Sequence, residues 1–142
     1  HADWSNAKAI PVVASPACSE EQRQAAELFL IGMNVIPIWS KDHPGLYVIR
    51  SIAMLVNEAC EAVLHDIASE QDIDSAMKYG VNYPCGPFDW ADRIGYYTIL
   101  QILENMYHVY GEDRYRTSIY LAKKAVQGHA QKTQQQPLRV AG

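Results

Sequence analysis

The sequence predicts a mainly α-helical domain that is preceded by a short strand–helix–strand segment. Beyond residue 44, apolar residues recur every three or four positions, which is the period of amphipathic helices. Before residue 40, two short β-branched runs flank one helical stretch. The chain has 142 residues, a length that suits one domain with one hydrophobic core.

Composition excludes several classes of partner. The net charge is −4, so the sequence has neither the basic footprint of a nucleic-acid-binding protein nor that of a protein that binds anionic membranes. The longest apolar run, residues 25–38, is interrupted by polar residues, glycine and proline, and is shorter than the roughly 20 residues of a membrane span. The three cysteines of the chain are far apart in the sequence, which predicts no disulfide framework, no metal site and a reducing, cytoplasmic location.

The first forty residues are expected to form strand, helix and strand. Residues 10–14 form a β-branched run in which Pro11 is tolerated only at a sheet edge or a first position. Ser19 followed by two glutamates and a glutamine is typical of a helix start, and Gly32 is expected to end that helix. A second short strand is predicted over residues 34–39.

A long amphipathic helix is predicted to begin near Pro44 and to run for roughly 20 residues. Its apolar stripe lies at Ile49, Ile52, Ala53, Val56, Ala59, Cys60, Val63 and Ile67. The polar residues assigned to its other face are Arg50, Asn57, Glu58, Glu61, His65 and Asp66.

Four further elements follow this helix. Ser69 caps the next helix, which is expected to bury Ile73, Ala76 and Met77 and to stop at a left-handed Gly80. After a Pro/Gly loop, a short helix is expected to end at Gly95, and a longer one covers residues 96–110. A last helix is predicted over about 118–127, followed by a polar, Gln-rich tail.

Five short patterns occur in one order along the chain. They are the Pro-Gly entry to the long helix (42–50), Asn-Glu-Ala (57–59), an acidic helix start leading to Ala-Met-Lys-Tyr-Gly (69–80), Pro-Cys-Gly-Pro-Phe (84–88), and Gly-Glu-Asp-Arg-Tyr-Arg (111–116). In this order they resemble the C-terminal helical domain of 3-hydroxyacyl-CoA dehydrogenases, over about residues 34–121. The resemblance implies a helical bundle of the 6-phosphogluconate dehydrogenase C-terminal type, flanked by the end of a Rossmann-like sheet.

The resemblance also implies a function. Members of this family oxidise (S)-3-hydroxyacyl-CoA with NAD in fatty-acid or aromatic-acid β-oxidation, and their helical domains close one side of the cleft and form a homodimer interface. We therefore expect residues 1–41 to be a Rossmann-like remnant or linker, 42–128 the helical domain and 129–142 a flexible tail. The expected partners are a second copy, an N-terminal Rossmann domain of a longer parent chain and, through that parent, acyl-CoA.

Two departures from the family pattern argue against catalysis by this segment. The family has a substrate-positioning Asn where this chain has Ile49, and isoleucine has no hydrogen-bond donor or acceptor. The sequence has no Gly-x-Gly, so no dinucleotide cradle is expected here, and no segment matches the family's catalytic His and Glu. We therefore predict no catalytic, cofactor-binding or metal-binding residue in this chain. The Ile49 position fits a second, degenerate copy of the helical domain.

The candidate binding and interface residues each have a simpler interpretation. Arg50 and Gly45 are candidates for substrate binding; Arg50 is otherwise expected to pair with an acid such as Asp42, and Gly45 to permit a tight turn. Four tyrosines are candidates for a subunit interface, or otherwise for the core, namely Tyr96, Tyr97, Tyr107 and Tyr110. A non-catalytic dimerisation module and an acyl-CoA-binding lobe remain as alternative functions.

Overall fold

The chain divides into two compact units between Leu46 and Tyr47. A computed structural model describes residues 8–43 and 46–134. The first unit contains the strands, and the second contains five of the six α-helices of the described residues. The predicted mainly α-helical class is confirmed.

In the first unit, β1 (Ala9–Val13), α1 (Glu20–Gly32) and β2 (Ile36–Ser40) form a parallel two-stranded sheet with one crossover helix. Ala9 lies opposite Ile36, and the register continues to the pair Val13 and Ser40. Ser19 accepts a hydrogen bond from the Gln22 amide at 3.2 Å, and the Gln22 side chain accepts one from the Ser19 amide at 2.9 Å. This capping box explains why the helix begins where the sequence predicts.

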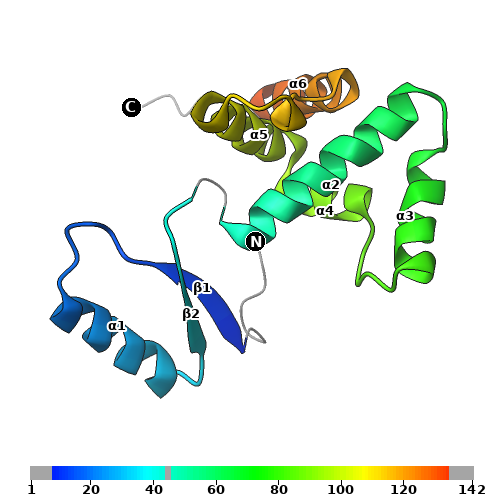
Figure 1. Cartoon of the computed structure of the whole chain (residues 1–142). Coiled ribbons are helices and arrows are strands. Elements are labelled where there is room, and N and C mark those ends of the chain that lie inside the picture. Colours follow the sequence, from blue (N-terminus) through cyan, green and yellow to red (C-terminus); the bar gives the residue numbers. More distant parts are fainter. Residues whose placement is uncertain (1–7, 44–45, 135–142) are drawn as a thin grey trace, which may run out of the picture. The chain divides into compact units, whose positions relative to one another are not determined.

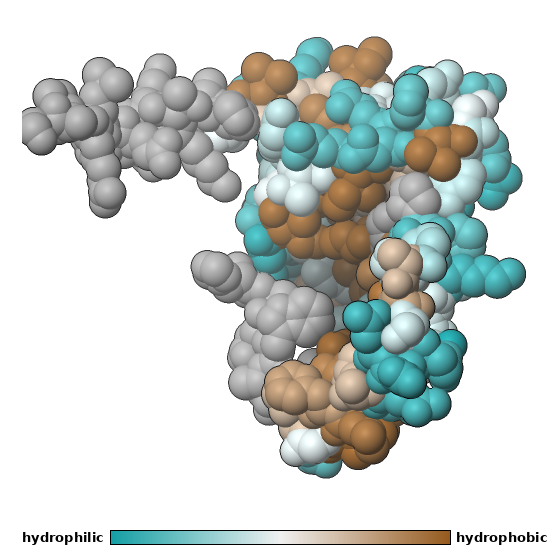
Figure 2. All heavy atoms as spheres, turned by 90° about the vertical axis from the view of Figure 1, so that its left-hand side faces the viewer, coloured by the Kyte–Doolittle hydropathy of each residue, from teal (hydrophilic) through white to brown (hydrophobic). Residues whose placement is uncertain are grey.

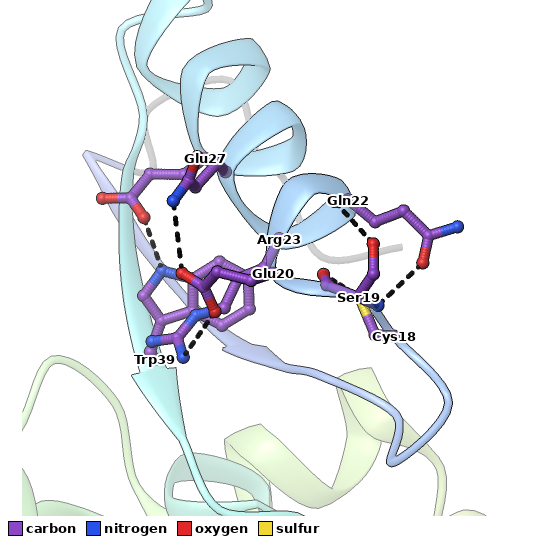
Figure 3. A network of polar contacts seen from close by, with 8 residues as sticks. Cys18, Ser19, Glu20, Gln22, Arg23, Glu27 and Trp39 are labelled. Atoms are coloured by element: carbon purple, nitrogen blue, oxygen red, sulfur yellow. Dashed lines mark hydrogen bonds and ion pairs between the residues drawn. The ribbon is translucent and has the colours of Figure 1, made fainter.

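Trp39 joins β2 to α1 (Figure 3). Its indole Nε1 donates to Glu27 Oε2 at 3.1 Å, and the Arg23 guanidinium lies 4.5 Å above the ring. The side chain of Trp39 therefore lies on the face of the sheet that α1 covers. No residue of α1 is fully buried, however, and Leu28 and Phe29 are 71% and 67% exposed.

The second unit is a helical bundle arranged around α2 (Tyr47–Leu64) (Figure 1). The helices α4 (Pro87–Ile94), α5 (Tyr96–Tyr110) and α6 (Ile119–Gln134) all contact α2, while α3 (Glu70–Gly80) packs mainly against α4. A short 3₁₀ turn, η1 (Asp113–Tyr115), follows α5. The core of this unit consists of Ala53, Val56, Ala59, Cys60, Phe88, Ala91, Ile99, Leu103, Met106, Tyr115 and Leu121.

Several details differ from the sequence-based expectation. Gly80 is the last residue of α3 and not a left-handed stop, because the positive φ of 58° falls on Asn82. The buried residue of α3 is Asp74, while Ala76 is exposed. The helix α6 extends to Gln134, seven residues beyond the predicted end. Pro44 and Gly45 lie outside the described residues, so the predicted role of Gly45 stays a prediction.

Candidate functional site

Arg50 lies in the first turn of α2, beside two aromatic rings. Its guanidinium carbon is 5.0 Å from the ring centre of Tyr110 and 5.1 Å from that of Tyr115. Nη2 also donates a hydrogen bond to the Tyr115 hydroxyl. The two tyrosine rings are 5.4 Å apart, and Tyr115 is only 1% exposed. The cation is thus held by cation–π contacts to both rings and by one hydrogen bond.

This arrangement supports a structural interpretation of Arg50. A side chain that reached for a phosphate would have to leave two rings and the Tyr115 hydroxyl. The neighbouring Ile49 is half-buried and offers no polar atom. The hydrogen bond expected of a substrate-positioning Asn at this position therefore has no equivalent in the Ile49 side chain.

Asn57 forms a second attachment between α2 and the segment after α5. Its Nδ2 donates to the Arg116 carbonyl at 3.0 Å, and its Oδ1 accepts from the Ser118 amide at 2.8 Å. Asn57 is only 2% exposed, so the prediction that it lies on the face opposite the apolar stripe was wrong. Only the place of Asn57 in the Asn-Glu-Ala pattern could have indicated that it is buried. The residue type gives no such signal, because asparagine is polar whether it faces water or a buried loop.

The four candidate interface tyrosines occupy different environments. Tyr97 and Tyr107 are 43% and 46% exposed, whereas Tyr96 and Tyr110 are half-buried. Burial, with a smaller contribution from Asp92, raises the pKa of Tyr96 well above its ordinary value. The structure therefore leaves Tyr97 and Tyr107 accessible to a partner, while Tyr96 and Tyr110 contribute to packing within the unit.

An open hollow of about 700 Å³ lies at the end of α5. Its lining residues are Glu104, Tyr107, His108, Gly111, Tyr115, Arg116 and Thr117. Over the ranges that the structure describes, no group of three His, Cys, Asp or Glu side chains is placed to hold a metal ion. The hollow combines a glutamate, an arginine and a histidine with two tyrosine rings, and this set of side chains by itself defines no reaction.

The buried thiols are poor nucleophiles. Burial raises the pKa of Cys60 to about 12, and burial also raises the pKa of Cys85. A thiol reacts as its thiolate, so both side chains are largely unreactive at neutral pH.

No helix of the described residues is long and apolar enough to cross a membrane.

Comparison with known proteins identifies the class of protein. Residues 45–139 match the family model described as "3-hydroxyacyl-CoA dehydrogenase, C-terminal domain". The chain therefore belongs to the 3-hydroxyacyl-CoA dehydrogenase family, and its helical unit is the C-terminal domain of that family. The family resemblance carried by the five ordered patterns is confirmed.

Among individual relatives, the chain is 39% identical to 3-hydroxyadipyl-CoA dehydrogenase of Escherichia coli over 84% of its own length and 25% of that protein. It is 38% identical to a probable 3-hydroxybutyryl-CoA dehydrogenase of Deinococcus radiodurans over 65% of the chain and 33% of the relative. A crystal structure described as 3-hydroxybutyryl-CoA dehydrogenase from Escherichia coli superposes with a TM-score of 0.81 at 37% identity, covering 87% of this chain and 26% of that one. The chain thus spans about a quarter to a third of these relatives.

Proposed function

We propose that this chain is the C-terminal segment of an NAD-dependent 3-hydroxyacyl-CoA dehydrogenase of fatty-acid or aromatic-acid β-oxidation in the cytoplasm. It supplies a homodimerisation surface and one wall of the substrate cleft and performs no chemistry alone. The observation that carries this proposal is the first turn of α2, where Ile49 offers no polar contact and Arg50 is held between Tyr110 and Tyr115. Such a turn supports packing, not recognition of a polar substrate.

The residues present do not fit NAD. In a dinucleotide-binding parallel sheet, a glycine-rich turn after the first strand normally cradles the pyrophosphate. Here the turn between β1 and α1 reads Ala-Ser-Pro-Ala-Cys-Ser over residues 14–19 and contains no glycine. In this proposal, NAD and the catalytic base belong to an upstream lobe of the parent protein.

An activity assay on the 142-residue chain tests the absence of chemistry. We expect no turnover of acetoacetyl-CoA and NADH, because the chain lacks a dinucleotide cradle and a positioned base. The complete gene product is the positive control and should oxidise NADH. Saturable NADH oxidation by the 142-residue chain would contradict the proposal.

Static light scattering over a dilution series tests the dimerisation role. Val109 and Tyr107 on α5 are 58% and 46% exposed, and apolar burial of about 800 Å² per partner is the usual scale of a stable interface. We expect a dimer whose dissociation constant rises at least about tenfold in Val109→Asp, because an interfacial carboxylate would have to be desolvated. Gln101→Asp, an exposed polar position on the same helix, is the matched control. A strict monomer at high concentration would remove this role.

The acyl-CoA-binding lobe is the second candidate, and the hollow at the end of α5 is the observation that favours it. If it is correct, calorimetry should detect acetoacetyl-CoA binding that weakens in Arg116→Ala, since Arg116 lines the hollow, and is partly retained in Arg116→Lys. We rank it below dimerisation because Ile49 lacks polar atoms. A blank titration would eliminate it.

A further inference from the structure

The helix α3 differs from its neighbours in how it is attached. Within the residues that the structure describes, it is the only helix of the helical unit without a buried apolar residue, and its one buried residue is Asp74. Ile73 is only partly buried against the core. The shorter helix α4, which lies beside α3 (Figure 1), buries Pro87, Phe88 and Ala91. Apolar contacts therefore hold α3 less firmly than they hold the other helices.

Polar contacts hold α3 at three points along its length. In the first turn, Glu70 pairs with Lys124 of α6 at 2.7 Å. In the middle, Asp74 accepts hydrogen bonds from two backbone amides at the start of α4. In the last turn, Lys78 donates to Asp89 of α4 at 3.0 Å. Each of these attachments depends on a charged side chain.

A residue with positive φ lies on each side of α3. Asp66 has a φ of 54° and precedes the helix, and Asn82 has a φ of 58° and follows it. Asp and Asn adopt this conformation more readily than most residues. Hinges usually consist of a few residues at the ends of helices and strands. We name residues 67–81, which lie between these two positions, the α3 arm.

The α3 arm covers the loop that leads into α4. Asp74 lies so close to Gly86 that a Cβ at this glycine would clash with the carboxylate. Cys85, the preceding residue of the loop, is a free thiol and is only 5% exposed. If the α3 arm moved away, the loop would lose this cover and the Cys85 thiol would become accessible.

The exposed apolar side chains of the α3 arm do not by themselves indicate a partner. Ile67 and Tyr79 are 74% and 89% exposed. Figure 2 shows hydrophobic surface among hydrophilic side chains on the side of the chain that it draws. Apolar side chains that are exposed singly are normal in folded chains, so Ile67 and Tyr79 define no docking surface.

We propose that the α3 arm opens as one segment while the other helices of the unit stay folded, and that the Glu70–Lys124 pair is the latch that keeps it closed. Lys124 belongs to a helix other than α4, against which α3 mainly packs, so the latch adds a second helix to the attachment. Opening exposes the thiol of Cys85. This property is independent of the proposed function, because all the contacts involved lie within the helical unit.

Native-state hydrogen exchange of the 142-residue chain, measured over a series of low urea concentrations, tests the separate opening. Peptides from residues 70–80 should exchange at least about tenfold faster than peptides from α5. Their exchange should also depend less on urea, because a local opening exposes less surface than global unfolding. Equal rates, or an equal urea dependence, would show that α3 opens only with the whole unit and would overturn the proposal.

Lys124→Met tests the latch. The substitution is on α6, so it removes the partner of Glu70 without altering the sequence of α3. Exchange of the peptides from residues 70–80 should rise at least about fivefold, because a charge-assisted hydrogen bond is lost. Lys123→Met, at the neighbouring exposed position, is the matched control and should change this exchange by less than about twofold. Equal exchange in the two variants would refute the latch, and Lys124→Gln repeats the measurement if Lys124→Met does not fold.

Labelling of Cys85 measures the opening by a second method. In a Cys18→Ser background, Lys124→Met should accelerate the reaction of Cys85 with a maleimide by about the same factor as the exchange of α3. Peptide mapping separates Cys85 from the other buried thiol, Cys60. Faster exchange of α3 with unchanged labelling of Cys85 would show that the α3 arm does not uncover the loop.

Discussion

Gly86 has no room for a side chain. A Cβ built there would lie 2.1 Å from Cγ of Asp74, which is only 7% exposed. The carboxylate of Asp74 accepts from the Phe88 amide at 2.8 Å and from the Asp89 amide at 3.0 Å, and so satisfies the free amides at the start of α4. The glycine of the Pro-Cys-Gly-Pro-Phe pattern is therefore required by close approach, since its φ of −78° is open to any residue.

We expect Gly86→Ala to lower the free energy of unfolding by about 1–3 kcal/mol, because the methyl group must displace a carboxylate that is fixed by two amides. Urea unfolding followed by circular dichroism measures the change. Gly80→Ala is the control: no atom lies within 4 Å of its Cβ and the residue is helical, so this variant should be slightly more stable than the natural chain. Equal stability of the two variants would contradict the role of Asp74.

Asn57→Ala should also destabilise the helical unit by about 1–3 kcal/mol. The substitution leaves the buried Ser118 amide without its partner and also removes the hydrogen bond to the Arg116 carbonyl. Glu58→Ala, at the next and exposed position of α2, should change stability by less than about 0.5 kcal/mol. Thermal unfolding of the three proteins at one pH makes the comparison, and an Asn57→Ala profile that overlays Glu58→Ala would refute the attachment.

At the scale of elements, α3 is attached to α6 through charged and phenolic side chains. Glu70 in the first turn of α3 accepts from Tyr120 at 2.6 Å and pairs with Lys124 at 2.7 Å. The Lys124 ammonium also lies 5.5 Å from the Tyr96 ring centre. Burial alone would raise the pKa of Glu70, but the hydrogen bonds from Lys124 and Tyr120 outweigh it and hold the pKa below its ordinary value of 4.5.

This network predicts a pH dependence of known sign. Because the pKa of Glu70 is lower in the folded than in the unfolded chain, the unfolded chain binds more protons near pH 4, and stability rises with pH there. The stabilisation is complete above about pH 5 and is lost as the pH falls through the folded pKa. Glu70→Gln should lower stability at pH 7 and flatten the dependence between about pH 3 and pH 5, as measured by urea unfolding. An unchanged slope in the variant would argue against the network.

At the scale of the whole molecule, the two units differ in how much they bury. The buried core residues all belong to the helical unit, whereas α1 has none and the sheet exposes Ile36 and Ile38. Local stability follows the burial of apolar contacts. The strand–helix–strand unit of the 142-residue chain is therefore expected to be much less stable than the helical unit.

Hydrogen exchange measured by mass spectrometry checks this difference. Peptides from α1 should exchange at least about tenfold faster than peptides from α5, whose Ile99, Leu103 and Met106 are fully buried. Peptides from α3, which has one buried residue, provide an internal reference between the two. Equal protection across both units would show that the first unit is stabilised by contacts other than its own.

The sequence by itself determined the period of each helix, most of the caps and the family. Local signals suffice for these features: Ser19 with Gln22 and Ser69 with Asp72 form caps from neighbouring residues, and apolar spacing specifies which side of a helix packs. Glycine and asparagine signals were less reliable. After α3 ends at Gly80, the positive φ falls on Asn82, because several nearby residues can adopt a positive φ.

Only the tertiary structure decided which polar residues are buried and what they bind. Asn57 bonds to Arg116 and Ser118, which follow it by 59 and 61 positions in the sequence. Asp74 caps a helix that begins 13 residues later, and Arg50 stacks on Tyr115. A polar side chain has the same helical periodicity whether its partner is water or a distant backbone group, so no local pattern separates the two.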